Sequence, residues 1–455
     1  MALSATSTAV PPALAPPARR AVLPVTVAAP FLVLMAYSAP AATLPQTAAG
    51  LHAGQIAQTW ILNGIALGLS AALLTAGALA DNLGRKRLFG LGAVLLTLAS
   101  VADTLAPNAL VFVLARIVQG VSGAALLTAS LGMIGHAFPG PARVKATALW
   151  GAMIGAGLTA GPVLSGLLAE HWSWRAIYGL LALGSAVLAA VSLPVLSESR
   201  ADDPQRVDLP GVTALALGLT ALLAAVTQGR TGWTRPSVGL MFALAAILLT
   251  GFVVIELRSR APMLDLGLFR RRAFLASTLG AIVTGLAVIG PLSYMPTILA
   301  RTHGFGALEA AETMAIWTAI SVLASIVAGR LTLPARPQLA VAFGIGAAGA
   351  LALVGLARDW SWPHAIGALT LVGVGSGLAN AALARLAVES VPADRAGMGS
   401  GANNTARYIG GSLGVAAAIA IAGSGRDLAA GADTMFVVAA VISVAGALLA
   451  LLLRD

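Results

Sequence analysis

The chain has 455 residues, of which 58% are hydrophobic and only 10% are charged. Soluble globular proteins carry about 25% charged residues, so this composition excludes a soluble chain with a charged surface. The net charge of +10 comes from basic residues scattered between apolar stretches, which excludes a nucleic-acid-binding face, and the absence of cysteine excludes disulfides and thiolate metal sites. No metal-ligand spacing or phosphate-binding loop occurs, so we expect no metal, no cofactor and no ATP-driven pump.

Apolar stretches of about 20 residues, each long enough to cross a bilayer, follow one another along the chain. Before them, residues 1–20 form a Pro- and Ala-rich tail that we expect to be disordered and cytoplasmic. Breaks at Gly, Pro and charge clusters predict fourteen transmembrane helices, at residues 21–45, 55–79, 88–104, 109–135, 145–169, 175–195, 209–228, 237–257, 274–299, 308–329, 338–357, 365–385, 397–422 and 434–453.

The basic residues predict how these helices are oriented. With the N-terminus in the cytoplasm, most of the 27 Lys and Arg residues fall in cytoplasmic segments, as the positive-inside rule requires. We therefore expect a multi-pass protein of the cytoplasmic membrane, surrounded by lipid, with both termini in the cytoplasm.

Two loops resemble each other weakly and indicate an internal repeat. Residues 77–87 follow the second predicted helix, and residues 329–338 follow the tenth. The pattern predicts an N-terminal six-helix bundle at 21–200, two inserted transmembrane helices at 201–260 and a C-terminal six-helix bundle at 261–455. Two related bundles around a site near the membrane midplane are typical of secondary transporters.

The first of these loops combines glycines, one acid and a basic triplet, and it resembles the signature loop of the major facilitator superfamily. Glycine permits a tight turn, and Asp81 against the N-terminal end of a facing helix would contribute about 0.3–2 kcal/mol. The resemblance implies that the loop holds the cytoplasmic side closed in one state; the alternative is an ordinary basic loop. The expected gating residues here are Gly77, Asp81, Gly84, Arg85, Lys86 and Arg87.

The fourth predicted helix contains an arginine, Arg116, followed by Gln119 and Gly120. An arginine inside a span costs a few kcal/mol and usually faces a partner or a wet cavity. The segment resembles the second motif of the same superfamily, which implies that Arg116 takes part in proton coupling. The alternative is a structural arginine that pairs only with backbone carbonyls.

The fifth predicted helix has glycines four residues apart and a Gly-Pro step. Small residues at this spacing let helix backbones touch, and the proline bends the helix. The run resembles the antiporter motif of drug exporters, with Ser165 in place of one glycine. The resemblance implies a hinge, with Gly157, Gly161 and Pro162 in gating; the alternative is plain helix packing.

The thirteenth predicted helix contains a segment that resembles the fourteen-helix drug:proton antiporter subfamily, at Asn403, Asn404, Thr405 and Arg407. The resemblance covers residues 21–455. It implies an all-α integral membrane protein of the major facilitator fold that exports small hydrophobic or amphipathic compounds by alternating access, in exchange for protons. That subfamily has an aspartate in the first helix where this chain has Ala36, and Leu333 stands near the place of the second-half acid.

A proton carrier is therefore expected elsewhere, and Glu312 at the start of the tenth predicted helix is the candidate. Glu309 and Glu312 are three residues apart, so they share one helical face. We expect no other span to place a carboxylate as deep, and we assign proton coupling to Glu312, Glu309 and Arg116. The alternative is that Glu312 is a wetted interfacial glutamate without a role in turnover.

Polar and aromatic residues within the spans are the candidates for substrate contact, although an aromatic residue in a span more often serves packing. They are Tyr37, Trp60, Asn63, Gln119, Tyr294, Met314 and Trp317. A mostly apolar cavity with few polar anchors suits hydrophobic or amphipathic molecules.

The expected partners are a small-molecule substrate, protons and lipid, with the chain acting as a monomer. The missing acid in the first helix leaves open a uniporter or a single-metabolite exporter without proton coupling. A membrane enzyme or a non-transporting sensor is more remote, because the sequence contains neither a polar catalytic cluster nor a soluble domain.

Overall fold

The computed structural model describes residues 16–138, 140–199, 208–229, 232–259, 262, 264–328, 331, 333–391 and 396–453. These ranges are built from helices and contain no β-strand. The helices are α1 (Pro16–Ser38), α2 (Pro40–Gly50), α3 (Gln55–Leu83), α4 (Arg85–Leu105), α5 (Ala109–Ala137), α6 (Gly140–His171), α7 (Ala176–Val195), α8 (Leu209–Gly229), α9 (Pro236–Arg258), η1 (Leu266–Arg270), α10 (Arg272–Thr284), η2 (Gly285–Ile289), α11 (Gly290–His303), α12 (Ala307–Ala328), α13 (Ala335–Ala352), α14 (Trp362–Glu389), α15 (Ala396–Ala422) and α16 (Leu428–Leu452).

The all-α prediction is confirmed, and each predicted span coincides with a helix or a broken helix. Thirteen of the described spans have the length and hydropathy needed to cross a membrane. The remaining one, α13, is short, and its first turn contains the polar residues Arg336 and Gln338. It ends at Ala352, five residues before the predicted end at residue 357. Beyond Ala352, Gly355 turns the chain with φ 91° and donates its N–H to Asp433 over 2.8 Å.

The first predicted span is interrupted near its end. α1 stops at Ser38 and α2 starts at Pro40, because proline lacks an N–H and fixes φ, which suits the first turn of a helix but ends the preceding one. α1 also begins at Pro16, inside the segment 1–20 that the composition predicts to be disordered.

The expected loop at 77–87 is mostly helical. α3 continues to Leu83 and α4 starts at Arg85, so Gly84 alone makes the turn. Its φ of 97° lies in the left-handed region that favours glycine.

The ninth predicted span consists of α10, α11 and the π-helical segment η2 between them. Pro291, the second residue of α11, cannot donate a backbone hydrogen bond, which explains a local change of helical register. Single π-turns inside longer helices are frequent at functional sites.

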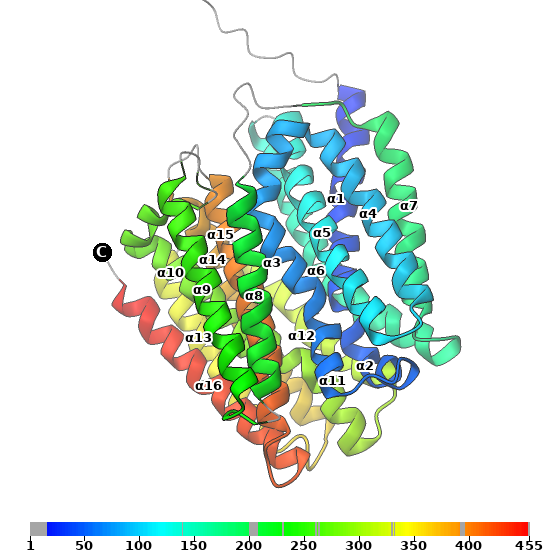
Figure 1. The fold of residues 1–455 in the computed structure, drawn as a ribbon, viewed down its shortest axis with the longest axis vertical. Helices are drawn as coiled ribbons and strands as arrows, with labels where there is room; N and C mark the ends of the chain where they lie inside the picture. The colour runs from blue at the N-terminus through cyan, green and yellow to red at the C-terminus, as the bar shows by residue number, and fades with distance from the viewer. Residues whose placement is uncertain are drawn as a thin grey trace, which may run out of the picture.

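The two six-helix halves pack through reciprocal pairs of helices. α3 lies against α15, and α6 lies against α12. Counted by span, these are the second and fifth members of each half, as expected for two related repeats. Figure 1 shows the N-terminal half in blue to cyan beside the C-terminal half in yellow to red.

The helices α8 and α9 pair with each other along one side of the molecule (Figure 1). α8 contacts both α3 and α15, so this pair covers one edge of the junction between the halves. The outer face of α9 presents Leu240, Ile247 and Leu257, which are 70%, 68% and 68% exposed. So many exposed large apolar side chains on one helix suit contact with lipid rather than water.

Candidate functional site

Arg116 of α5 is fully buried and binds the last turn of α1. Its guanidinium donates hydrogen bonds to the main-chain carbonyls of Ala36 at 2.7 Å and Tyr37 at 3.3 Å. It also donates to the side-chain oxygen of Gln119 at 2.7 Å. Arg116 thus contacts the turn of α1 where the subfamily that this chain resembles has an aspartate. In this chain the arginine binds backbone carbonyls at that turn.

This network continues into α4. The Gln119 amide donates to the Ser100 hydroxyl over 2.9 Å. Asp103, one turn further along α4, is 0% exposed, and neither of its carboxyl oxygens has a hydrogen-bond partner among the described residues. Nε of Arg116 likewise lacks a partner there, and Arg116 is the charged side chain that acts electrostatically on Asp103.

The expectation that no span places a carboxylate as deep as Glu312 is wrong. Asp103 is fully enclosed by neighbouring helices, whereas the Glu312 side chain lies on an uncovered face of α12 and is exposed. The sequence carried a signal for Asp103, because it lies inside the predicted span 88–104, three residues after Ser100. A span-buried carboxylate is a functional-site candidate.

Glu309 has a local structural task at the start of α12. Its carboxylate accepts the Gly306 N–H at 3.0 Å, which satisfies one of the free donors at the helix start. Among the described residues, no hydrogen bond joins Glu309 or Glu312 to the network around Arg116, and their part in coupling stays a prediction.

The expected antiporter motif in α6 lies between α1 and α12. A Cβ on Gly161 would stand 2.6 Å from the Met35 carbonyl of α1, and one on Gly166 would stand 2.8 Å from the Ala307 carbonyl of α12. Helix backbones in contact at this distance require glycine. The run therefore packs α6 against its own half and against the other half.

Two polar residues of α6 strengthen this packing. Ser165, which replaces a motif glycine, donates to the Ala39 carbonyl at 2.8 Å, at the break between α1 and α2. Thr159 donates to the Thr318 hydroxyl of α12 at 2.9 Å. Gly157 and Pro162 lie in the same helix, with Gly157 against α1.

The segment of α15 that resembles the subfamily motif binds α10 within the C-terminal half. The Asn403 amide donates to the carbonyl and hydroxyl oxygens of Ser277 at 3.0 and 2.9 Å. Arg407 makes one long hydrogen bond to Asn403, at 3.4 Å. The Thr405 hydroxyl is buried without a partner among the described residues, and Asn404 is half-buried.

Contacts between the halves include residues from this motif helix. The rings of Tyr37 and Tyr408 approach to 5.6 Å between centroids, which links α1 to α15. The Asn63 amide of α3 donates to the Ser412 carbonyl of α15 at 3.1 Å. Tyr37 and Asn63, two of the predicted substrate contacts, thus lie at the junction of the halves.

The other predicted substrate contacts are buried or half-buried, and Tyr294, Met314 and Trp317 belong to a hydrophobic cluster that includes residues of both halves. Tyr294 and Met314 are buried, and the Trp317 indole donates to Ser376 over 3.1 Å inside the C-terminal half. Gln119 belongs to the Arg116 network, and Trp60 packs with the hydrophobic cluster formed with α8. Their role in substrate contact stays a prediction.

The expected gating turn is held by an acid that the motif does not contain. Glu198, in the segment after α7, accepts the Lys86 N–H at 3.1 Å and lies 3.8 Å from the Arg87 guanidinium. Its carboxylate thus sits at the N-terminal end of α4, where the helix dipole favours negative charge. The backbone of Asp81 is described in α3, but its side chain lies outside the described residues.

A cavity of about 490 Å³ lies between the halves at the end of the molecule away from this turn. Its lining combines small apolar residues with four polar side chains, none of which the sequence analysis selects. These polar residues are His52, Gln58, Thr297 and Arg301. The volume is within the range of about 300–1,000 Å³ that small-molecule sites occupy.

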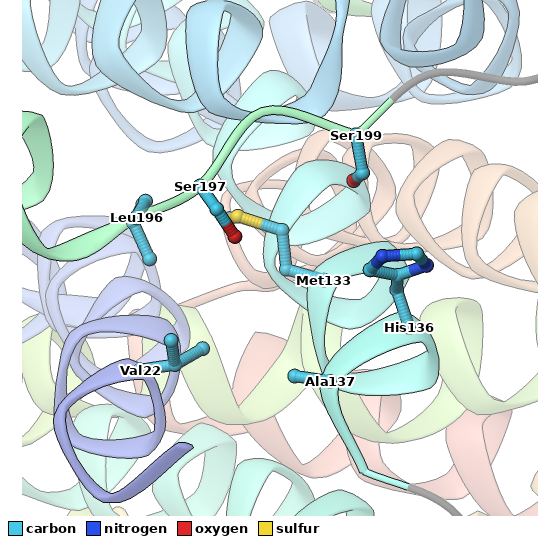
Figure 2. A pocket seen from close by; sticks show the side chains of 7 residues that line it. All are labelled: Val22, Met133, His136, Ala137, Leu196, Ser197 and Ser199. Atoms are coloured by element: carbon cyan, nitrogen blue, oxygen red, sulfur yellow. The ribbon is translucent and has the colours of Figure 1, made fainter. Parts of the chain in front are cut away.

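A much smaller crevice lies at the opposite end, within the N-terminal half. Figure 2 shows Val22 of α1, Met133 and His136 of α5, and the segment after α7 around it. Its volume of about 10 Å³ suits about one water molecule and excludes an organic substrate. Within the described ranges, no group of three His, Asp or Glu side chains gathers to hold a metal ion.

Comparison with known proteins gives the same family over most of the chain. The sequence model of the Major Facilitator Superfamily matches residues 26–415. Multidrug resistance protein Stp of Mycobacterium tuberculosis (strain CDC 1551 / Oshkosh) is 31% identical over 381 residues, covering 82% of this chain and 70% of that protein. Drug efflux pump JefA of the same strain is 30% identical over 396 residues, covering 85% and 77%. The human organic anion transporter MFSD10 (TETRAN) has a similar fold, with a TM-score of 0.67 at 15% identity over 96% of this chain and 100% of that one.

Proposed function

Because the chain belongs to the Major Facilitator Superfamily, we propose that this multi-pass membrane transporter exports small hydrophobic or amphipathic compounds across the cytoplasmic membrane, in exchange for protons. The similarity to Stp and JefA, which are named for drug resistance and efflux, supports export as the direction. The matched family indicates a small-molecule substrate and a transporter rather than an enzyme.

The observation that carries this proposal is the cavity between the halves. It is large enough for a small organic molecule and is lined by Pro45, alanines and glycine, with the polar residues His52, Gln58, Thr297 and Arg301. A mostly apolar wall with a few polar groups accepts molecules of varied shape while still orienting them. The cavity belongs to both halves, so rocking of one half against the other would open or close it.

The sidedness of transport follows from the charges. The turn carrying Arg85, Lys86 and Arg87 would lie in the cytoplasm, with both termini, under the positive-inside rule. The cavity at the other end would then open outward, and the contact of Glu198 with this turn would help close the cytoplasmic side. We propose that the gating turn and the glycines of α6 permit alternating access. We also propose that a single chain is sufficient for it.

An efflux assay tests the proposal directly. Full-length protein in liposomes, with an imposed pH gradient, is expected to move members of a panel of hydrophobic cations, anions and neutral drugs against their gradients. A protonophore should abolish that movement. Transport that is only downhill and indifferent to the protonophore would instead identify a uniporter, the rival that Ala36 in α1 favours.

Filling the cavity is the structural control. Ala49→Trp places a bulky ring in the cavity lining, so we expect slower export of the panel compounds. Leu98→Trp, at a position of α4 that is 60% exposed and outside the cavity lining, should leave export rates close to those of the parent. Equal rates for Ala49→Trp and the parent would remove this cavity from the transport path.

A further inference from the structure

Asp103 is a buried acid that the family motifs do not include. It lies near the end of α4, is 0% exposed, and has no hydrogen bond to either oxygen among the described residues. An ionised carboxylate in such surroundings is costly unless a charge of opposite sign compensates it. Packing alone does not require an acid at this position, so its presence needs another explanation.

The groups that face Asp103 come from the helices packed against α4, which are α3, α5 and α7. α5 contributes Arg116, and α7 contributes Tyr178, whose buried hydroxyl also lacks a partner in the described chain. Arg175, just before α7, is held by a hydrogen bond to a main-chain carbonyl of α4 at 3.0 Å. The titratable residue of α3, Asp81, lies at the opposite end of that helix.

Arg116 connects Asp103 with the junction of the halves. The guanidinium of Arg116, which acts electrostatically on Asp103 across the contact of α4 with α5, also holds the carbonyls of Ala36 and Tyr37, in the last turn of α1 before its break. The ring of Tyr37 contacts Tyr408 of the other half. A change of charge on Asp103 would alter how firmly Arg116 holds this turn, and thereby the contact between the halves.

We propose that Asp103 is the proton-binding side chain of the transport cycle and that Arg116 is the positioning residue that transmits its charge state to α1. This inference rests on the proposed proton-coupled export. The carboxylate takes up one proton from the outer side and releases it to the cytoplasm in each cycle. Protonated Asp103 leaves Arg116 bound to the α1 carbonyls, as in this structure, and ionised Asp103 draws the guanidinium away from them.

Transport by variants tests the role in coupling. Ethidium is the probe, loaded into liposomes that contain full-length protein, with and without a pH gradient. Asp103→Asn is expected to lose gradient-driven ethidium movement at least tenfold while retaining downhill exchange. Asp359→Asn, the same change at an exposed loop position, should behave as the parent.

The outcomes separate this inference from the proposed function. If the parent protein itself ignores the pH gradient, proton-coupled export fails. If the parent responds and Asp103→Asn responds equally well, the role of Asp103 is overturned while proton-coupled export stands. Loss of gradient-driven movement in Glu312→Gln but not in Asp103→Asn would assign the coupling to Glu312.

Infrared spectroscopy gives a readout that depends on neither transport nor substrate. In lipid vesicles, the parent should show a carboxylic acid C=O band that titrates with pH and is absent from Asp103→Asn. Asp359→Asn and Glu312→Gln should both retain the band. A titrating band that persists unchanged in a folded Asp103→Asn protein, judged by its thermal unfolding, would overturn the assignment.

Discussion

The guanidinium of Arg116 donates a hydrogen bond of 2.7 Å to the main-chain carbonyl of Ala36. Ala36 thus has a methyl group where the subfamily that this chain resembles has an acid. Arg116 binds the backbone at that position. The buried acid on which Arg116 acts electrostatically is instead Asp103 of α4, and no hydrogen bond joins these two side chains in the described part of the chain. Arg116 thus pairs with main-chain carbonyls and with the Gln119 side chain, and its part in coupling stays a prediction.

If Arg116 needs a carboxyl partner rather than Asp103 in particular, moving the acid should preserve function. The double variant Ala36→Asp/Asp103→Asn is expected to recover part of the pH-gradient-driven efflux lost in Asp103→Asn, because the new carboxyl lies beside the same guanidinium. Efflux from liposomes measures the recovery. Ala36→Asn/Asp103→Asn has the same size without the acid and should show none. Equal efflux from the two double variants would contradict the exchange of position.

The electrostatic link between Asp103 and Arg116 should appear as coupling in a double-mutant cycle. Asp103→Asn and Arg116→Met, alone and together, are expected to show a coupling energy of about 0.5–3 kcal/mol in unfolding, as for residues in one polar network. Thermal unfolding in detergent provides the measurement. Asp103→Asn combined with Arg407→Met, in the other half, should be additive, and additivity of the first pair would deny the link.

The contact of Gly161 with α1 leaves no space for a side chain. Gly161→Ala is expected to destabilise the protein by about 1–3 kcal/mol and to slow export, because the added methyl group must push α6 away from the Met35 carbonyl. Gly151→Ala is the matched control on the same helix, where an added Cβ meets no atom within 4 Å. If the Gly161→Ala protein is as stable as the Gly151→Ala protein, then the contact between α6 and α1 has room for a methyl group.

Glu198 should act on the closure of the cytoplasmic end more than on stability. Its pair with Arg87 is partly exposed, so Glu198→Gln should change the unfolding free energy by less than about 1 kcal/mol. The chain has no cysteine, so Ser197→Cys is a unique reporter. We expect faster maleimide labelling of Ser197→Cys when Glu198→Gln is added, and no change with Glu170→Gln, an exposed acid at the other end. If Glu198→Gln and Glu170→Gln both leave the labelling rate of Ser197→Cys unchanged, Glu198 has no role in closure.

The orientation of the inserted pair can be measured in the same cysteine-free background. Thr234→Cys, between α8 and α9, is expected to react with an impermeant maleimide from outside intact cells. Gly267→Cys, in η1 after α9, should react only when the membrane is opened. Both sites are exposed. Reaction of both from the same side would contradict the fourteen-helix topology and the cytoplasmic position of the termini.

The sequence by itself determined the helices and the identity of the fold. A run of about 20 apolar residues has few alternatives in lipid, because only a helix satisfies every backbone group within the run. The glycines of residues 77–87 also indicated a tight turn, which the structure places at Gly84, and the motifs around Arg116 and in α6 marked the family. The break after Ser38 was readable from Pro40 but was not anticipated, because apolar composition continues across it.

Only the tertiary structure decided which side chains meet. Asp103, Arg116 and Ala36 lie on three helices, and their proximity depends on the rotation and tilt of each helix against its neighbours. The hydrophobic periodicity of a span is weak, since lipid-facing and buried surfaces are both apolar, so sequence does not fix that rotation. For the same reason Glu312 looked buried in sequence and is exposed in the structure. Glu198 contacts the start of α4 because α7 ends on the same side of the bundle as α4 begins.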